Sequence, residues 1–116
     1  MTGPIYFLPE SELSEEGQQF VKNYEAKYDE PIQPYTAYAY EAANVMLDAI
    51  ENASEEAGGD VPDREAVVQQ IFATEDYHGV LGTWSFDEDG DSTLTKVSAQ
   101  RVENGKIEFY RTIDAG

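Results

Sequence analysis

The spacing of apolar residues changes once along this 116-residue chain, and that change limits what the chain can fold into. Up to about Thr74 the apolar residues recur every three or four positions, which is typical of helices that pack on one side. From Val80 onward they alternate, which is typical of half-buried strands. The sequence therefore predicts three helices followed by three strands, an α+β arrangement.

The three predicted helices have recognisable ends. The first spans about 14–28, with Ser14 as its N-cap and two acidic residues in its first turn. The second and strongest spans about 35–53, and the third begins after Asp63, another good N-cap, and ends near Thr74. The residues expected on the apolar face of the second helix are Tyr35, Tyr38, Ala39, Ala42, Val45, Met46, Ala49, Ile50 and Ala53.

The strands are predicted over 80–86, 94–102 and 106–113. Asn104-Gly105 joins the last two, and this pair favours a two-residue hairpin because both residues tolerate a positive φ. Between the first two helices, Pro31 and Pro34 exclude a continuing helix and favour extended residues before them. Segment 31–34 is therefore predicted to be a short extended crossing.

The charge of the chain disfavours two classes of partner. It has 24 acidic and 7 basic residues, a net charge of −17. Nucleic acids are therefore poor partners and anionic membrane surfaces are disfavoured, because both attract clustered Lys and Arg. Two explanations of the acidity stay open, a high-salt habitat and a domain that is simply very soluble. The chain has no cysteine, no apolar run near 18 residues and no targeting signal.

An acidic loop at 87–91 raises the question of a calcium site. Asp87, Asp89 and Asp91 occupy positions 1, 3 and 5 of an EF-hand register. That register requires Gly at position 6 and Glu at position 12, where this chain has Ser92 and Ser98. The loop is therefore predicted to be a solvated turn, and no metal ligand is assigned, although a calcium site of another kind stays open.

No catalytic residue is assigned either. His78 is the only histidine, and no Ser or Thr lies in a context typical of an activated nucleophile. Gly58-Gly59 lies in an acidic loop that would repel a phosphate, so no nucleotide or other cofactor is predicted. With 24 carboxylates, no acid pair for glycoside hydrolysis stands out. A small hydrolase is therefore disfavoured, and the chain is predicted not to be an enzyme.

Tyrosines crowd the start of the second predicted helix. Tyr35, Tyr38 and Tyr40 follow Pro34 directly, where a helix N-terminus offers free N–H groups and a positive dipole end. A tyrosine at such a place can pack on an apolar ligand and hydrogen-bond a polar one. The simpler interpretation is that they belong to the core or its rim, and for Tyr38 and Tyr40 we favour it.

Five motifs in order resemble the C-terminal third of type I periplasmic binding proteins, of the branched-chain amino-acid receptor type that serves ABC importers. They are FVKNYEAKY, PYTAYAYEA, DREAV, GVLGTWSFDEDGD and VENGK. Together they extend over nearly the whole chain. Members of this family have two α/β lobes joined by three crossing segments, and they trap a ligand between the lobes.

The resemblance implies a division of the chain. Residues 1–30 would be a remnant of the second lobe, 31–34 a hinge crossing, and 35–93 a remnant of the first lobe. Residues 94–116 would form the return crossing and a C-terminal hairpin. The fold class implied is the type I periplasmic binding protein fold, present here as an incomplete α+β fragment.

The resemblance also implies a function. The full-length parent would capture a small polar ligand, an amino acid, and deliver it to a membrane permease from the periplasm or the cell surface. Tyr35 matches the cleft-facing aromatic residue after the hinge proline, so it is the ligand-binding residue expected here. The fragment alone is expected not to bind ligand and to be oligomeric or strand-swapped, because its apolar faces lack their cover. The alternative is a stand-alone acidic α+β protein-interaction module.

Overall fold

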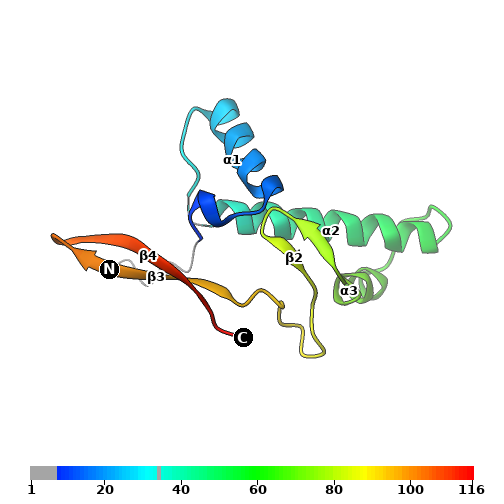
Figure 1. Cartoon of the computed structure of the whole chain (residues 1–116). Helices are drawn as coiled ribbons and strands as arrows, with labels where there is room; N and C mark the ends of the chain where they lie inside the picture. Colours follow the sequence, from blue (N-terminus) through cyan, green and yellow to red (C-terminus); the bar gives the residue numbers. More distant parts are fainter. Residues whose placement is uncertain (1–7, 34) are drawn as a thin grey trace.

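A computed structural model describes residues 8–33 and 35–116 of the chain (Figure 1). The prediction of three helices followed by strands with a C-terminal hairpin is confirmed. Residues 1–7 of the predicted second-lobe remnant and Pro34 of the predicted crossing lie outside the described residues. The elements are η1 (Glu10–Glu12), α1 (Glu15–Tyr28), α2 (Thr36–Glu56), α3 (Arg64–Phe72), β1 (Tyr77–Gly79), β2 (Gly82–Trp84), β3 (Lys96–Glu103) and β4 (Lys106–Asp114).

Side-chain caps set the starts of two helices, as the sequence predicts. The Ser14 hydroxyl accepts a hydrogen bond from the Gly17 N–H at 3.0 Å, at the first turn of α1. The Asp63 carboxylate accepts one from the Ala66 N–H at 2.8 Å, at the first turn of α3. Each cap satisfies a backbone donor that has no partner within its helix. α1 ends at Asp29, whose φ of 53° is left-handed.

The long helix α2 buries a narrower stripe than predicted. Of the nine apolar residues expected on its face, Val45, Ala49 and Ala53 are buried, whereas Met46 and Ile50 are exposed. The reason is visible in Figure 1: α3, α1 and the β1–β2 hairpin cover only part of the α2 surface. A single row at four-residue spacing is therefore buried. Its members are Ala37, Glu41, Val45, Ala49 and Ala53.

The strand predicted over 80–86 is instead part of a tight hairpin. β1 pairs antiparallel with β2, with Tyr77 opposite Trp84 and Gly79 opposite Gly82. The chain reverses at Val80 and Leu81, and Gly82 has a φ of 111° that favours glycine. The alternation of apolar residues continues through the turn, so the pattern alone did not reveal it.

The C-terminal hairpin forms as predicted. β3 and β4 pair antiparallel around Asn104 and Gly105, whose φ values are 52° and 76°. Both positive angles match the hairpin turn that this residue pair favours. The two strands project away from the helices as an arm, and the described molecule extends 59 × 35 × 28 Å (Figure 1).

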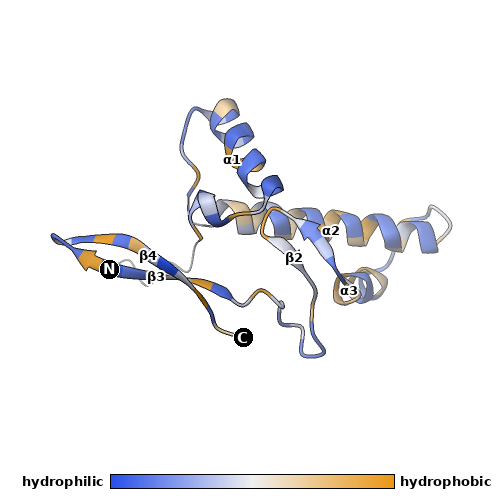
Figure 2. Ribbon diagram, viewed as in Figure 1, coloured by the Kyte–Doolittle hydropathy of each residue, from blue (hydrophilic) through white to orange (hydrophobic). Residues whose placement is uncertain are grey.

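The buried core is small for the length of the chain. Three of its members are alanines, and many large apolar side chains are exposed, including bands on both strands of the arm (Figure 2). None of the described helices has an apolar stretch long enough to cross a membrane. Among residues 8–33 and 35–116, the buried apolar ones are Leu13, Val21, Ala37, Val45, Ala49, Ala53, Val80 and Trp84.

Candidate functional site

Tyr35, the residue predicted to contact a ligand, lies at the N-terminus of α2. It is the N-cap residue, and its side chain is 71% exposed. Its backbone carbonyl accepts the Ala39 N–H at 2.9 Å, so the residue is fixed by the first turn of the helix. Partial burial, and then the neighbouring Tyr35, raise the pKa of Tyr38. An exposed ring at a helix N-terminus can contact a ligand that approaches it.

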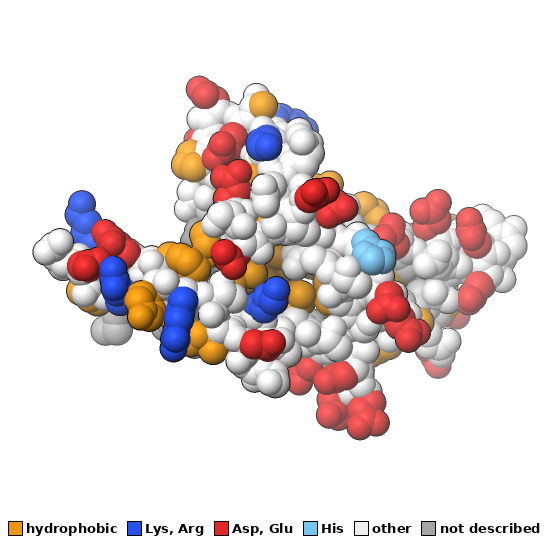
Figure 3. Space-filling model, viewed as in Figure 1, with side chains coloured by type: hydrophobic (Ala, Val, Ile, Leu, Met, Phe, Trp, Pro, Cys, Tyr) orange, Lys and Arg blue, Asp and Glu red, His pale blue; other side chains and the backbone are white. Residues whose placement is uncertain are grey.

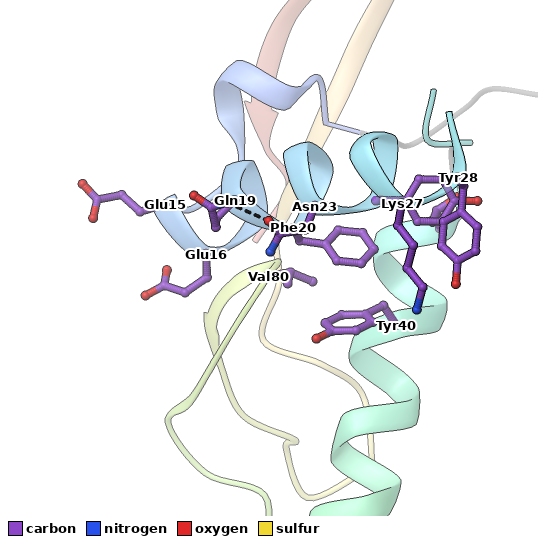
Figure 4. A pocket seen from close by; sticks show the side chains of 11 residues that line it. Glu15, Glu16, Gln19, Phe20, Asn23, Lys27, Tyr28, Tyr40 and Val80 are labelled. Atoms are coloured by element: carbon purple, nitrogen blue, oxygen red, sulfur yellow. Dashed lines mark hydrogen bonds between the residues drawn. The ribbon is translucent and has the colours of Figure 1, made fainter. Parts of the chain in front are cut away.

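A groove of about 770 Å³ separates α1 from the first half of α2 (Figure 4). Its floor is aromatic: the Phe20 ring stacks on the Tyr40 ring with centroids 4.4 Å apart, and Tyr24 lies 4.7 Å from Tyr28. Lys27 extends over the Tyr28 ring at 5.3 Å. The groove is open to solvent, and its ring contacts join α1 to α2 beside the buried Val21 of α1. Its lining residues are Glu15, Glu16, Gln19, Phe20, Asn23, Tyr24, Lys27, Tyr28, Thr36, Tyr40 and Val80.

A second hollow, of about 560 Å³, lies on the other side of α2. Met46 of α2 and Ile71 of α3 line one wall, and Trp84 and Phe86 line another. Leu94, which precedes the arm, and Val97, at the start of β3, complete the lining, which is mostly apolar. Apolar surface of this extent, open to solvent, is expected to be covered by another part of a protein.

A buried carboxylate fastens α2 to the β1–β2 hairpin. Glu41 is 2% exposed, and its Oε2 accepts the Val80 N–H at 2.7 Å. Its Oε1 accepts the Trp84 indole N–H at 2.7 Å and lies 3.4 Å from the Leu81 N. Partial burial, and then the negative charges of Asp48 and Glu41, raise the pKa of Tyr77 on the adjacent strand. The Glu41 carboxylate therefore satisfies two backbone donors of the hairpin turn and the Trp84 indole N–H.

Sequence reasoning missed Glu41. It lies four residues after Ala37 and four before Val45, in the middle of the row that the helix buries. A lone acid in an apolar row is the signal that could have identified it, because a buried carboxylate requires donors. With 24 carboxylates in the chain, that signal did not stand out.

The same turn is held from the opposite side by the start of α1. The Ser14 Oγ lies 3.1 Å from the Gly79 carbonyl oxygen and 3.2 Å from that of Val80. A Cβ on Gly17 would lie 2.3 Å from the Val80 carbonyl oxygen, so only glycine allows this approach. These contacts join the segments predicted to belong to different lobes. They are compatible with packing inside one lobe or across a closed cleft, so the division at 31–34 stays a prediction.

In the acidic loop at 87–91, the side chain of Asp87 closes a turn of the backbone. The Asp87 Oδ1 accepts the backbone N–H groups of Asp89 and Asp91, at 3.0 and 2.9 Å. Gly90 has a φ of 84°, as a tight turn requires. Within residues 8–33 and 35–116, no group of three or more acidic or histidine side chains is placed to hold a metal ion.

His78 lies on the exposed side of the β1–β2 hairpin. Its Nδ1 is 2.8 Å from the Thr83 Oγ1, its partner across the strands. The pair is exposed to solvent and lies in none of the hollows described above. The contact is a cross-strand pair of the kind that stabilises a short hairpin.

Comparison with known proteins gives a family match over most of the chain. The sequence model of a family described as periplasmic binding protein matches residues 1–106. No curated protein matches the chain.

Solved structures match with the same fold. A leucine-binding protein, LivK, from Thermotoga maritima is 31% identical with a TM-score of 0.71, over 94% of this chain and 29% of its own. The branched-chain amino-acid transporter substrate-binding protein LivJ from Streptococcus pneumoniae, in complex with isoleucine, is 26% identical with a TM-score of 0.72, over 92% and 28%. An ABC transporter substrate-binding protein from Desulfitobacterium hafniense, in complex with Leu, shares the fold at 23% identity and a TM-score of 0.71, over 90% and 29%. The chain thus spans less than a third of the length of the structures it matches.

Proposed function

Because this chain belongs to the periplasmic binding protein family, we propose that it is part of a longer substrate-binding protein that captures an amino acid for an ABC importer. The observation that carries the proposal is the family match over residues 1–106, together with 31% identity to a leucine-binding protein. The second relative above 25% identity is a branched-chain amino-acid transporter protein in complex with isoleucine. A branched-chain amino acid is therefore the ligand class we propose.

The longer protein, called the parent protein below, would act in the periplasm or at the cell surface and hand its ligand to a membrane permease. Its role would be binding rather than catalysis, because receptors of this kind act by closing around a ligand. The family match favours this function over that of a stand-alone acidic interaction module.

We expect the isolated chain not to bind an amino acid. Small-ligand sites bury most of the ligand surface between walls. Tyr35 is 71% exposed, so it can form at most one wall of such a site. The remaining walls would come from parts of the parent protein outside this chain.

We also propose that the isolated chain is oligomeric or strand-swapped. Exposed large apolar side chains lie on each of the three helices and on the arm, and the hollow beside Trp84 is open. Surface of this kind tends to be buried against a partner.

Tyr35→Ala is expected to weaken leucine binding about tenfold in a chimera that completes the site. In the chimera, this chain replaces the matching 29% of the Thermotoga maritima leucine-binding protein. The loss follows from removing an aromatic ring that would pack on the ligand. Isothermal titration calorimetry measures the dissociation constant.

Tyr40→Ala is the matched control for this test. Tyr40 lies on the same helix but stacks on Phe20 in the groove, so its loss should leave leucine affinity unchanged. Tyr35→Phe should keep most of the affinity, because it retains the ring. Equal affinities of the chimera and its Tyr35→Ala variant would show that Tyr35 is not a ligand residue.

A further inference from the structure

An almost purely acidic surface covers residues 42–93, which comprise most of α2, α3, the β1–β2 hairpin and the acidic loop. This segment contains 13 acidic residues and one basic residue, Arg64, a net charge of −12. All 13 acidic residues are exposed. Figure 3 shows Asp and Glu spread over this part of the molecule, and most of the visible Lys and Arg over the arm and α1. Solvent and its ions therefore reach every one of these acids.

The acids of α2 lie at the unfavourable end of the helix. A helix dipole favours acidic residues in the first turn and basic residues in the last. α1 follows this rule, with Glu15 and Glu16 in its first turn and Lys27 in its last. α2 has no acidic residue in its first turn and no basic residue in its last, where Glu55 and Glu56 lie instead. The C-terminal end of α2 is therefore destabilised by its own side chains.

More negative charge gathers at the same end of α2. Glu51 precedes Glu55 by four residues, a spacing that makes two side chains neighbours on the helix surface. The Ser54 hydroxyl donates to the Asp60 carbonyl oxygen at 3.0 Å, which holds the backbone of a further acidic residue beside this end. Like charges at such distances repel each other and weaken the helix.

Acids of different elements also face each other. Asp48 of α2 and Glu75, between α3 and β1, line one small hollow of about 220 Å³, and no basic residue lines it. After its partial burial, the negative charge of Asp48 is a cause of the raised pKa of Tyr77 in the same hollow. Within the described part of the chain, the one ion pair joins Arg101 to Glu103 on the arm. The acids of residues 42–93 therefore repel each other without a basic partner.

Salt decides how strongly this repulsion acts. Side chains four residues apart on a helix have Cβ atoms about 5–6 Å apart. The screening length is about 8 Å in roughly 0.15 M salt and about 3 Å in roughly 1 M salt. Neighbouring carboxylates therefore repel each other strongly in dilute salt and weakly in concentrated salt.

Solubility alone does not account for this arrangement. A net charge of magnitude roughly 2–8 keeps a small domain soluble, and a charge anywhere on the surface serves that purpose. This chain carries −17, with acids placed where they oppose the helix that bears them. Of the two explanations of the acidity, the placement favours the high-salt habitat.

We propose that this chain is adapted to a high-salt medium, in which screening of the acids at the C-terminal end of α2 stabilises the fold. In dilute salt this end of α2 opens. α3 opens with it, because α3 is joined to it by the bond from the Gln70 amide to the Glu56 carboxylate at 2.9 Å. This dependence on salt involves neither the amino-acid ligand nor the parts of the parent protein outside this chain.

Urea unfolding of the whole chain in a series of KCl concentrations tests the proposal, with circular dichroism as the signal. The unfolding equilibrium constant should fall about tenfold or more between roughly 0.1 and 1 M KCl, because several repulsions of this kind are screened together. All samples must share one low protein concentration, since self-association also changes stability.

Glu55→Lys shows whether the repulsion at α2 is the cause. The substitution gives Glu51 an opposite charge four residues away and places a basic residue in the last turn. It should raise the urea midpoint in dilute salt and make the midpoint less dependent on KCl. Glu15→Lys is the matched control, because it changes the net charge equally but in the first turn of α1, where an acid is favourable. It should not raise the midpoint.

Hydrogen exchange measured by mass spectrometry locates the effect without a variant. Backbone amides of residues 46–57 should exchange more slowly in concentrated than in dilute KCl, because the end of α2 opens less often. Amides of α1, residues 15–28, are the internal reference, since its charges agree with its dipole. Their exchange should change less.

Three outcomes overturn the inference. The first is a chain that is equally stable, or unfolded, at every KCl concentration, or that KCl destabilises. The second is an equal rise of the midpoint in Glu55→Lys and Glu15→Lys, which indicates repulsion over the whole chain rather than at α2. The third is equal slowing of exchange in α1 and in residues 46–57. None of these results bears on ligand binding, which the chimera tests separately.

Discussion

Glu41→Ala is expected to lower the free energy of unfolding by about 2–5 kcal/mol. The substitution leaves the Val80 N–H and the Trp84 indole N–H buried without an acceptor, where each now donates at 2.7 Å. Urea unfolding followed by the fluorescence of Trp84, the only tryptophan, measures the change. With a slope of about 2 kcal/mol per molar, the midpoint should fall by about 1–2.5 M.

Glu41→Gln is the control for this prediction. Glutamine keeps one acceptor oxygen but brings an amide that donates, so it can satisfy one of the two buried N–H groups. The loss of unfolding free energy in Glu41→Gln should lie between zero and the loss in Glu41→Ala. All samples must share one protein concentration, because self-association makes stability depend on concentration. A Glu41→Ala variant as stable as the wild type would show that the carboxylate does not hold the turn.

Trp84→Ala is expected to lower the free energy of unfolding by about 3–5 kcal/mol, as is typical when a large buried aromatic side chain is removed. Trp84 is 7% exposed, and the centroid of its ring lies 5.0 Å from that of Phe86 and 5.6 Å from that of Tyr77. Its loss therefore opens the wall of the hollow beside α2. Circular dichroism at 222 nm measures the unfolding, since the variant has no tryptophan to report it.

Trp84→Phe separates packing from hydrogen bonding at this position. Phenylalanine fills much of the space but has no N–H for Glu41. The loss of unfolding free energy in Trp84→Phe should therefore be smaller than in Trp84→Ala. Combining each change with Glu41→Ala should give less than the sum of the single effects, because the 2.7 Å bond can be lost only once. Strictly additive effects would show that Glu41 and Trp84 are not coupled.

The sequence predicted the elements that depend on local chemistry. Ser14 and Asp63 cap helices because their side chains bond to N–H groups three residues away, a contact that lies within the sequence itself. Asn104-Gly105 sets the hairpin turn for a similar reason, since the required positive φ is a property of the two residues. Such signals do not depend on the rest of the fold.

The sequence did not predict features that depend on what covers a surface. Which row of α2 is buried is decided by α3, α1 and the β1–β2 hairpin, so Met46 and Ile50 are exposed and Glu41 is buried. The turn at Val80 was hidden because the apolar alternation runs through it. That turn is held by side chains from distant segments, Ser14 and Glu41, which no local pattern connects.

Tyr35 and the division into two lobes stay predictions for another reason. Both depend on surfaces outside this chain, which spans 29% of the length of the leucine-binding protein it matches. The exposed ring at the start of α2 is consistent with a wall of a ligand site. We propose that the surface facing this ring belongs to the part of the parent protein outside this chain.

The account is tested most directly by titrating leucine into two proteins, the isolated chain and the chimera with the Thermotoga maritima leucine-binding protein. Calorimetry should show saturable heat from the chimera and none from the isolated chain, because one wall of a two-lobed site does not enclose a ligand. A correctly folded chimera that binds neither leucine nor isoleucine would contradict the account. Saturable binding of leucine by the isolated chain would contradict it equally.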